Sequence, residues 1–126
     1  MRGVNKVTLL GNLGKEPEIH FSENNIPMAR FTLATTETYR DKNGQVVSQT
    51  EWHHIVLWRG LAEFAQKFLH KGNHVYLEGK IRSRHWDDKE GNRKQITEIV
   101  ADNLILLDKK TEDSGLSHVG DAIHGE

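Results

Sequence analysis

Hydrophobic and polar residues alternate along much of the chain, as they do in strands that bury one face. The segment 50–59, TEWHHIVLWR, departs from this rule because bulky residues occupy both alternating faces. Ile55 and Leu57 share one face, which the domain's own core can cover, whereas Trp52 and Trp58 share the other. The segment is therefore either a central strand covered by protein on both sides or a strand whose tryptophans stand on an open face. Flat rings on an open face are typical of nucleobase stacking.

The rest of the pattern predicts further strands and turns. Strands are expected at residues 4–13, 28–40, 73–86 and 95–107, with a short edge extension at residues 18–21. Gly11 within the first run suggests a bulge or a sharp bend, a device by which sheets curl into barrels. Asn43-Gly44 predicts a hairpin turn, and a second, polar hairpin loop centres on Gly91-Asn92.

One helix is expected, at residues 60–71. Leu61, Phe64, Ala65 and Phe68 form an apolar stripe that should plug one end of the sheet. Lys71 lies in the expected last turn, and Gly72 ends the helix. Five strands with a helix between the third and fourth match a mainly all-β fold, the five-stranded OB-fold Greek-key barrel. A small sandwich with one helix is the alternative.

The strand expected at residues 73–86 has two contrasting faces. Its predicted inner face holds Val75, Leu77, Ile81 and Ser83, and its outer face holds Tyr76, Glu78, Lys80, Arg82, Arg84 and Trp86. The outer row contains no acid after Glu78, although salt-bridged surface rows normally alternate in sign. Phosphate groups would supply the missing negative charge, and guanidinium groups also stack on bases.

Aromatic and cationic residues are thus interleaved on strand faces and near hairpin turns. The aromatic members are Tyr39, Trp52, Trp58, Tyr76 and Trp86. This combination favours single-stranded nucleic acid, whose bases are free to stack and whose backbone needs neutralising. Duplex recognition is disfavoured because the one expected helix is amphipathic and not a basic recognition helix.

Size and charge fit a single domain with a short tail. The chain has 126 residues and no cysteine, so neither disulfides nor thiolate sites are available. It has no apolar run of membrane-spanning length and no signal-peptide core, which makes a cytoplasmic location the default. Residues 1–110 carry a formal charge of +3 (17 basic, 14 acidic), and residues 111–126 carry −4. We expect a folded domain at residues 1–108 and a disordered tail at residues 109–126.

Enzymatic chemistry finds little support. His53 and His54 are adjacent, so on a strand they point to opposite faces and cannot chelate one metal ion together. No catalytic triad, phosphate-cradling glycine loop or acidic metal cluster is evident, so no catalytic residue, metal or cofactor is expected.

Four stretches of the sequence resemble one family. They are RGVNKVTLLGNLGKEPE (2–18), FTLATTETYRDKNG (31–44), TEWHHIVLWRGLAEFAQKFLHKGNHVYLEGKIRSRHW (50–86) and TEIVADNLILL (97–107). Together they resemble the bacterial single-stranded DNA-binding proteins of the homotetrameric OB-fold type. The resemblance covers residues 2 to about 107 and implies a non-catalytic, sequence-tolerant protein of the nucleoid that protects single strands during replication, recombination and repair.

The resemblance also implies roles for individual residues. The family's four stacking positions correspond to Tyr39, Trp52, Trp58 and Trp86; the first is usually Trp and the third often Phe. Its basic contacts correspond to Arg2, Lys6, Arg82 and Arg84. His53 corresponds to a histidine that the family uses near the subunit interface of the tetramer.

One feature departs from the family pattern. Family members usually continue into a Gly/Pro/Gln-rich linker and an acidic, phenylalanine-tipped peptide that recruits replication and repair enzymes, whereas this chain ends in HGE. Recruitment through such a peptide is not expected of these residues, and the sequence leaves open a truncated chain or a short paralogue. Two other functions stay open: a primosome component that mainly holds another protein, and a metal-dependent nuclease on an OB scaffold.

Overall fold

A computed structural model describes residues 2–108 of the chain, so the expected tail at residues 109–126 lies outside the described part. The described elements are β1 (Val7–Leu13), β2 (Glu18–Phe21), β3 (Pro27–Arg40), β4 (Val46–Trp58), α1 (Gly60–Phe68), β5 (His74–Asp87) and β6 (Arg93–Leu106). No described helix is both long and apolar enough to cross a membrane.

Five of these strands close into a barrel, as predicted. The order is β1-β5-β6-β4-β3, and an additional β1–β3 pairing completes the circle. The β4–β6 contact is parallel and the other pairings are antiparallel. β2 pairs only with the outer edge of β3, which confirms the predicted edge extension. Closure of the sheet removes the open edges that a sandwich would retain.

Gly11 lies where β1 passes from one neighbour to the other. The next residue, Asn12, pairs with His74 of β5 and also with Ala34 of β3. A Cβ atom at Gly11 would lie 2.2 Å from the carbonyl oxygen of Ala34. The predicted bulge is not found there, because the β1–β5 register is continuous through Gly11. The glycine instead permits the close backbone approach that closes the barrel.

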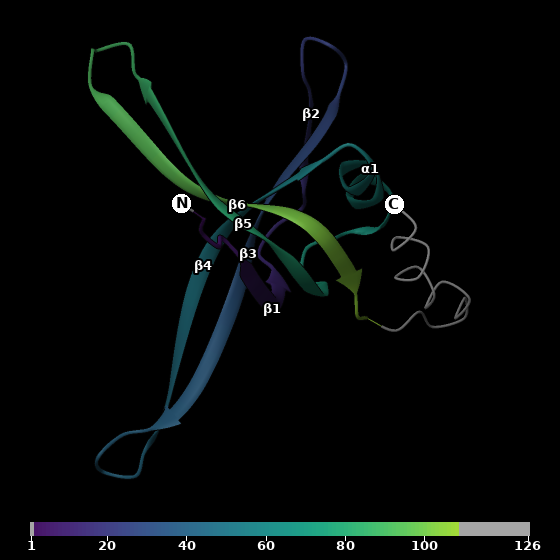
Figure 1. Ribbon diagram of the computed structural model, residues 1–126. Coiled ribbons are helices and arrows are strands. Elements are labelled where there is room, and N and C mark those ends of the chain that lie inside the picture. Colours follow the sequence, from purple (N-terminus) through teal and green to yellow (C-terminus); the bar gives the residue numbers. More distant parts are fainter. Residues whose placement is uncertain (1, 109–126) are drawn as a thin grey trace.

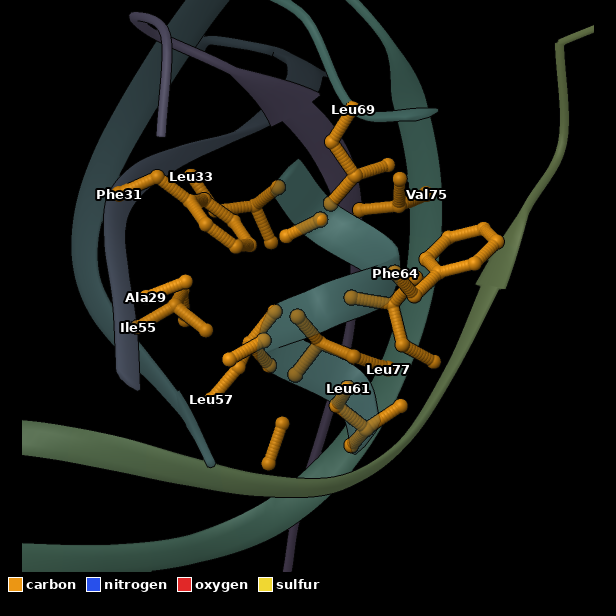
Figure 2. Packing of buried hydrophobic residues seen from close by; sticks show 14 of the residues in the cluster. Ala29, Phe31, Leu33, Ile55, Leu57, Leu61, Phe64, Leu69, Val75 and Leu77 are labelled. Carbon is orange, nitrogen blue, oxygen red and sulfur yellow. The ribbon is translucent and has the colours of Figure 1, made fainter. Parts of the chain in front are cut away.

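The core fills the barrel and the space beneath α1. Figure 2 shows the helix side chains Leu61 and Phe64 among the strand residues Leu57 and Leu77. Leu57 and Leu77 are fully buried. The predicted stripe of α1 is confirmed, with Phe68 partly buried and its ring centroid 5.0 Å from that of Phe64. The helix therefore seals one end of the barrel.

The helix ends at Phe68, so the predicted end at Lys71 was too late. The backbone N–H of His70 donates to the side chain of Asn73, and the N–H of Lys71 donates to Glu16. These side-chain acceptors take the N–H groups that a longer helix would bond to its own carbonyls.

Two long hairpins extend beyond the barrel (Figure 1). We call them the β3–β4 arm (residues 36–50) and the β5–β6 arm (residues 80–97). Ile81, predicted to face inward, is 47% exposed, and Ser83 is also exposed. That prediction was wrong because β5 has left the barrel beyond Gly79, so neither of its faces meets the core.

The same type of turn ends both arms, DKNGQ at residues 41–45 and DKEGN at residues 88–92. In each turn the first aspartate accepts the backbone N–H groups of residues two and four positions later. Both predicted hairpins are therefore confirmed, and each turn is stabilised by its own aspartate.

Candidate nucleic-acid interface

Trp52 and Trp58 occupy the outer face of β4. The two side chains are 56% and 41% exposed, whereas Ile55 and Leu57 on the opposite face are buried. Within residues 2–108, then, Trp52 and Trp58 are not covered by protein, as the open-face interpretation predicts. Val56 of the same outer face is buried, because it pairs with Arg30 on one side and Val100 on the other.

The ring of Trp52 rests on the backbone of Gly14. A Cβ atom at Gly14 would lie 2.4 Å from the ring atom Cζ3 of Trp52 and 2.7 Å from Oγ1 of Thr32. One side of the ring is thus supported by backbone, and over half of the side chain remains open to solvent. No sequence pattern indicates this role, because Gly14 is recognisable only as a residue that follows a predicted strand.

The basic row of β5 lies on the outer face of the β5–β6 arm. Lys80, Arg82, Arg84 and Trp86 are all exposed. Trp86 is 43% exposed, and the Cζ atom of Arg84 lies 5.4 Å from the centroid of its ring. This distance is within the range of a cation–π contact.

The basic row has a counter-charge that the sequence pattern concealed. Glu98 of β6, whose side chain is 4% exposed, accepts hydrogen bonds from Nε of Arg84 at 3.0 Å and from Nη2 at 3.2 Å. It also forms an ion pair with Arg30 of β3. The inference that phosphate alone must balance the row is therefore wrong for Arg84. Lys80 and Arg82 form no ion pair with any residue in the range 2–108.

Glu98 is ionised in this setting. Burial raises the pKa of its carboxyl group, but the hydrogen bonds from Arg84 and the charge of Arg30 outweigh burial and lower the pKa below its usual value. The same hydrogen bonds raise the pKa of Arg84. The three side chains together carry a net charge of +1.

Lys6 and Tyr76 lie at the barrel end of the outer face, away from Trp86. The Tyr76 hydroxyl donates to Glu78 at 2.6 Å, and Nζ of Lys6 lies 3.6 Å from the same carboxylate. The Tyr76 hydrogen bond, followed by the charge of Lys6, lowers the pKa of Glu78, and the same bond raises the pKa of Tyr76. Tyr76 is partly buried and pairs with Leu10 on one side and Ile105 on the other.

Tyr39 and Arg2 are both exposed, and Tyr39 does not share the tryptophan face. Tyr39 is 51% exposed and pairs with Val47 near the tip of the β3–β4 arm, whereas Trp52 pairs with Ala34. Because side chains alternate along a strand, the odd-numbered Tyr39 and the even-numbered Ala34 lie on opposite faces of β3. Arg2 precedes the first strand. The structure therefore does not bring all the predicted aromatic positions onto one sheet face.

His53 lies on the face opposite the tryptophans. Its Nε2 atom is 3.0 Å from Oγ1 of Thr35. Both residues line a groove of about 480 Å³ between β1 and the β3–β4 hairpin, whose other lining residues include Leu10 and Glu51. Leu10 is 53% exposed, which leaves an apolar side chain in solvent at this groove. Within residues 2–108, no three His, Asp or Glu side chains gather as metal ligands would.

Comparisons with known proteins identify the family. The profile described as the single-strand binding protein family matches residues 4–107. The "Single-stranded DNA-binding protein 1" of Xylella fastidiosa is 43% identical over 127 residues, which cover 100% of this chain and 91% of that protein. The "Single-stranded DNA-binding protein" of Neisseria meningitidis serogroup A is 45% identical over 112 residues, 89% of this chain and 64% of that protein.

Solved structures agree with the sequence comparisons. A Plasmodium falciparum SSB in complex with ssDNA matches with a TM-score of 0.79 and 37% identity, over 86% of this chain and 98% of that chain. The single-stranded DNA binding protein from Thermus aquaticus, solved as a deletion mutant, matches with a TM-score of 0.74 and 27% identity, over 85% of this chain and 52% of that chain. These matches confirm the predicted OB fold and accord with a binding protein and not an enzyme. The chain belongs to the single-strand binding protein family.

Proposed function

We propose that this protein binds single-stranded DNA, with little preference for sequence, along the outer faces of the barrel and its two arms. The observation that carries the proposal is the exposure of Trp52, Trp58 and Trp86 in a protein that also exposes Lys80 and Arg82, neither of which forms an ion pair within residues 2–108. Every base has a π-face, so stacking on these rings tolerates any sequence. Membership of the family, and the named ssDNA complex of a structural neighbour, support the ligand.

Phosphate neutralisation falls mainly to Lys80 and Arg82, whose charges are not balanced within the described residues. Arg84 shares its N–H groups between Glu98 and the backbone of the ligand. Arg2, Lys6 and the rings of Tyr39 and Tyr76 stay predictions as further contacts. Tyr76 is the least accessible of the aromatic set, and Lys6 would have to exchange Glu78 for a phosphate.

The test is a titration of the protein with oligo(dT) at low and at high salt, in which tryptophan fluorescence reports binding. Stacking on three exposed tryptophans should quench the emission strongly, and a duplex of the same length should quench it little. Affinity should fall steeply with salt because phosphate contacts release counterions. Equal quenching by duplex and single strand, or no quenching by either, would overturn the proposal.

We infer further that the protein assembles as a homotetramer. The groove beside His53 has the exposed Leu10 at its margin, and it is lined from the face of β4 opposite Trp52 and Trp58. Sedimentation equilibrium should give a mass near four times 14.4 kDa. A monomer at micromolar concentration would contradict this inference and leave the DNA-binding proposal untouched.

A protein of this kind would cover single strands wherever duplex DNA is opened, and hence act in replication, recombination and repair at the nucleoid. In cells, a fluorescent fusion should gather into foci when replication forks are stalled. A distribution unaffected by stalled forks would argue against this cellular role.

A further inference from the structure

We propose that Glu98 is a positioning residue of the DNA-binding face: it holds Arg84 against Trp86 and ties the two hairpins together where they diverge. The inference rests on the proposed single-stranded DNA binding and adds a residue that contacts no DNA itself. Three observations carry it: burial of the carboxylate, its bonds to two arginines from different strands, and the stacking of one of those arginines on Trp86.

The first step concerns Arg84. Of its five N–H donors, two bond to Glu98 at 3.0 and 3.2 Å. This two-point contact fixes the plane of the guanidinium group, which a single hydrogen bond would not do. The group then lies 5.4 Å from the centroid of the Trp86 ring. Trp86 sits near the tip of the arm, on a part of β5 that has left the barrel core, so Arg84 supplies one side of its packing.

The second step concerns the junction of the hairpins. β4 and β6 pair through only two residue pairs, Ile55 with Ile99 and Val56 with Val100. Glu98 directly precedes this short contact and bonds to Arg30 of β3 as well as to Arg84 of β5. One carboxylate therefore links the hairpin that carries Trp52 to the hairpin that carries Trp86. A strand that contacts both tryptophans depends on their relative position.

The third step is electrostatic. An acid beneath a phosphate-binding surface weakens its attraction for DNA, so a merely repulsive Glu98 would be a disadvantage to binding. If Glu98 instead positions Arg84, its loss should weaken DNA binding at high salt, where charge repulsion is screened. Replacement of Glu98 should free Arg84 for phosphate and thereby steepen the salt dependence, while the loss of ring support should weaken the part of binding that persists when charges are screened.

The experiment uses Glu98→Gln, which keeps the shape of the side chain and removes its charge. Its matched control is Glu90→Gln, which removes the same charge from an exposed turn of the same arm. Both are measured for oligo(dT) affinity across a salt series. In a Trp52→Phe, Trp58→Phe background, iodide quenching reports the accessibility of Trp86 alone.

For Glu98→Gln we expect about fivefold weaker binding at high salt, within the range of a lost cation–π contact, and a more accessible Trp86. We also expect the logarithmic salt slope to steepen by up to ~0.7, the value for one phosphate contact on a single strand. Glu90→Gln should change neither Trp86 accessibility nor the high-salt affinity. Tighter binding by Glu98→Gln at every salt concentration, with Trp86 unchanged, would overturn the proposal.

Arg84→Met and the double variant test whether Glu98 acts on Trp86 through Arg84. Accessibility of Trp86 should rise equally in Glu98→Gln, in Arg84→Met and in the double variant; additive effects would overturn the proposal.

If Glu98→Gln does not fold, Arg84→Met alone must still expose Trp86. If the unmodified protein does not bind oligo(dT), the proposed function fails; if it binds and these variants match the control, only the role of Glu98 fails.

Discussion

At the scale of single residues, the candidate interface depends on rings that are open on one side and supported on the other. Trp52 rests on backbone and Trp86 packs against a guanidinium group, so each is held in place while part of its surface stays in solvent. A ring held in this way loses little conformational entropy when a base stacks on it. Binding energy should therefore concentrate in these two positions.

Replacement of Trp52 or Trp86 by alanine should weaken oligo(dT) binding by a factor of ten or more, because each stacked base contributes on the order of 1–3 kcal/mol. Phe21→Ala is the matched control, since Phe21 is a 59% exposed aromatic residue on β2 outside the proposed path. Affinities are measured by fluorescence anisotropy of labelled oligo(dT), with circular dichroism to verify folding. Undiminished affinity in a folded Trp52→Ala protein would refute the assignment.

Gly14→Ala tests the support beneath Trp52. The new Cβ atom would lie 2.4 Å from the ring, so the ring must move away from its present position. We expect roughly fivefold weaker binding, less than the loss of a whole stacked base. Gly3→Ala is the control, because nothing lies within 4 Å of a Cβ atom at that position. If both variants bind alike, the position of the Trp52 ring does not depend on Gly14.

Alternation along the strands was sufficient to place Trp52, Trp58 and Trp86 on outer faces, because the face of a side chain is a local property, but it did not show that Tyr76 of such a face is partly buried. It could not reveal Gly14 or Glu98. Their partners are distant in sequence: Glu98 bonds to Arg84 and Arg30, 14 and 68 positions away. The pattern of its own strand predicts that Glu98 is an ordinary solvent-exposed acid. It is buried because β3, β5 and β6 come together around it.

At the scale of the elements, closure of the barrel depends on the short contact between β1 and β3. Only Asn12 and Leu13 of β1 pair with β3, at Ala34 and Leu33. Gly11 lies directly before this contact. The pairing is too short to tolerate a displaced backbone, so this seam should be sensitive to any atom added at Gly11.

Gly11→Ala should therefore destabilise the protein strongly, by about 3 kcal/mol or more, in the range of severe steric or backbone disruptions. The added Cβ atom would lie 2.2 Å from a backbone oxygen, which cannot rotate away as a side chain can. Urea denaturation followed by circular dichroism measures the loss, with Gly3→Ala again as the reference. A Gly11→Ala protein as stable as that reference would show that the seam can open without cost.

The elements themselves were largely predictable, since their order and type follow from period-two alternation, one amphipathic helix and two turn signals. The errors share one physical origin. The inward face of β5 was extended to Ser83, and α1 was extended to Lys71, because a periodic pattern continues in the sequence after its packing partner has ended. Where the barrel stops, and where Glu16 and Asn73 take over the helix's N–H groups, depends on contacts from other segments.

At the scale of the whole molecule, two hairpins that share only a short strand contact have to present their rings to one ligand. The barrel fixes their roots, and the Arg30–Glu98–Arg84 cluster adds an ionic link at the point of divergence. Breaking a buried ion pair is costly, although Arg30 and Arg84 keep 32% and 47% of their side-chain surface exposed, which reduces the cost. The cluster should therefore stabilise the fold moderately and in a way that depends on pH.

The direction of that dependence follows from Glu98. Burial favours its neutral form, but Arg84 and Arg30 lower its pKa in the folded protein below the usual value of 4.5. The unfolded chain thus binds this proton more readily than the folded protein does, so acid favours unfolding. The stabilisation by Glu98 is complete above pH 4.5 and is lost as the pH falls through the folded pKa.

Glu98→Gln should consequently lower the free energy of unfolding by about 1–2 kcal/mol at pH 7, and this deficit should shrink as the pH falls below 4.5 and through the lowered folded pKa of Glu98. Once the pH is below that folded pKa, the native side chain is a neutral carboxyl group with nearly the shape of glutamine, so the two proteins should become equivalent. Urea denaturation at a series of pH values measures the difference, with Glu90→Gln as a control that should show little deficit at any pH. A deficit that stays constant from pH 7 to acid would mean that Glu98 stabilises the fold through shape alone, and that the charge linking the two hairpins has no part in it.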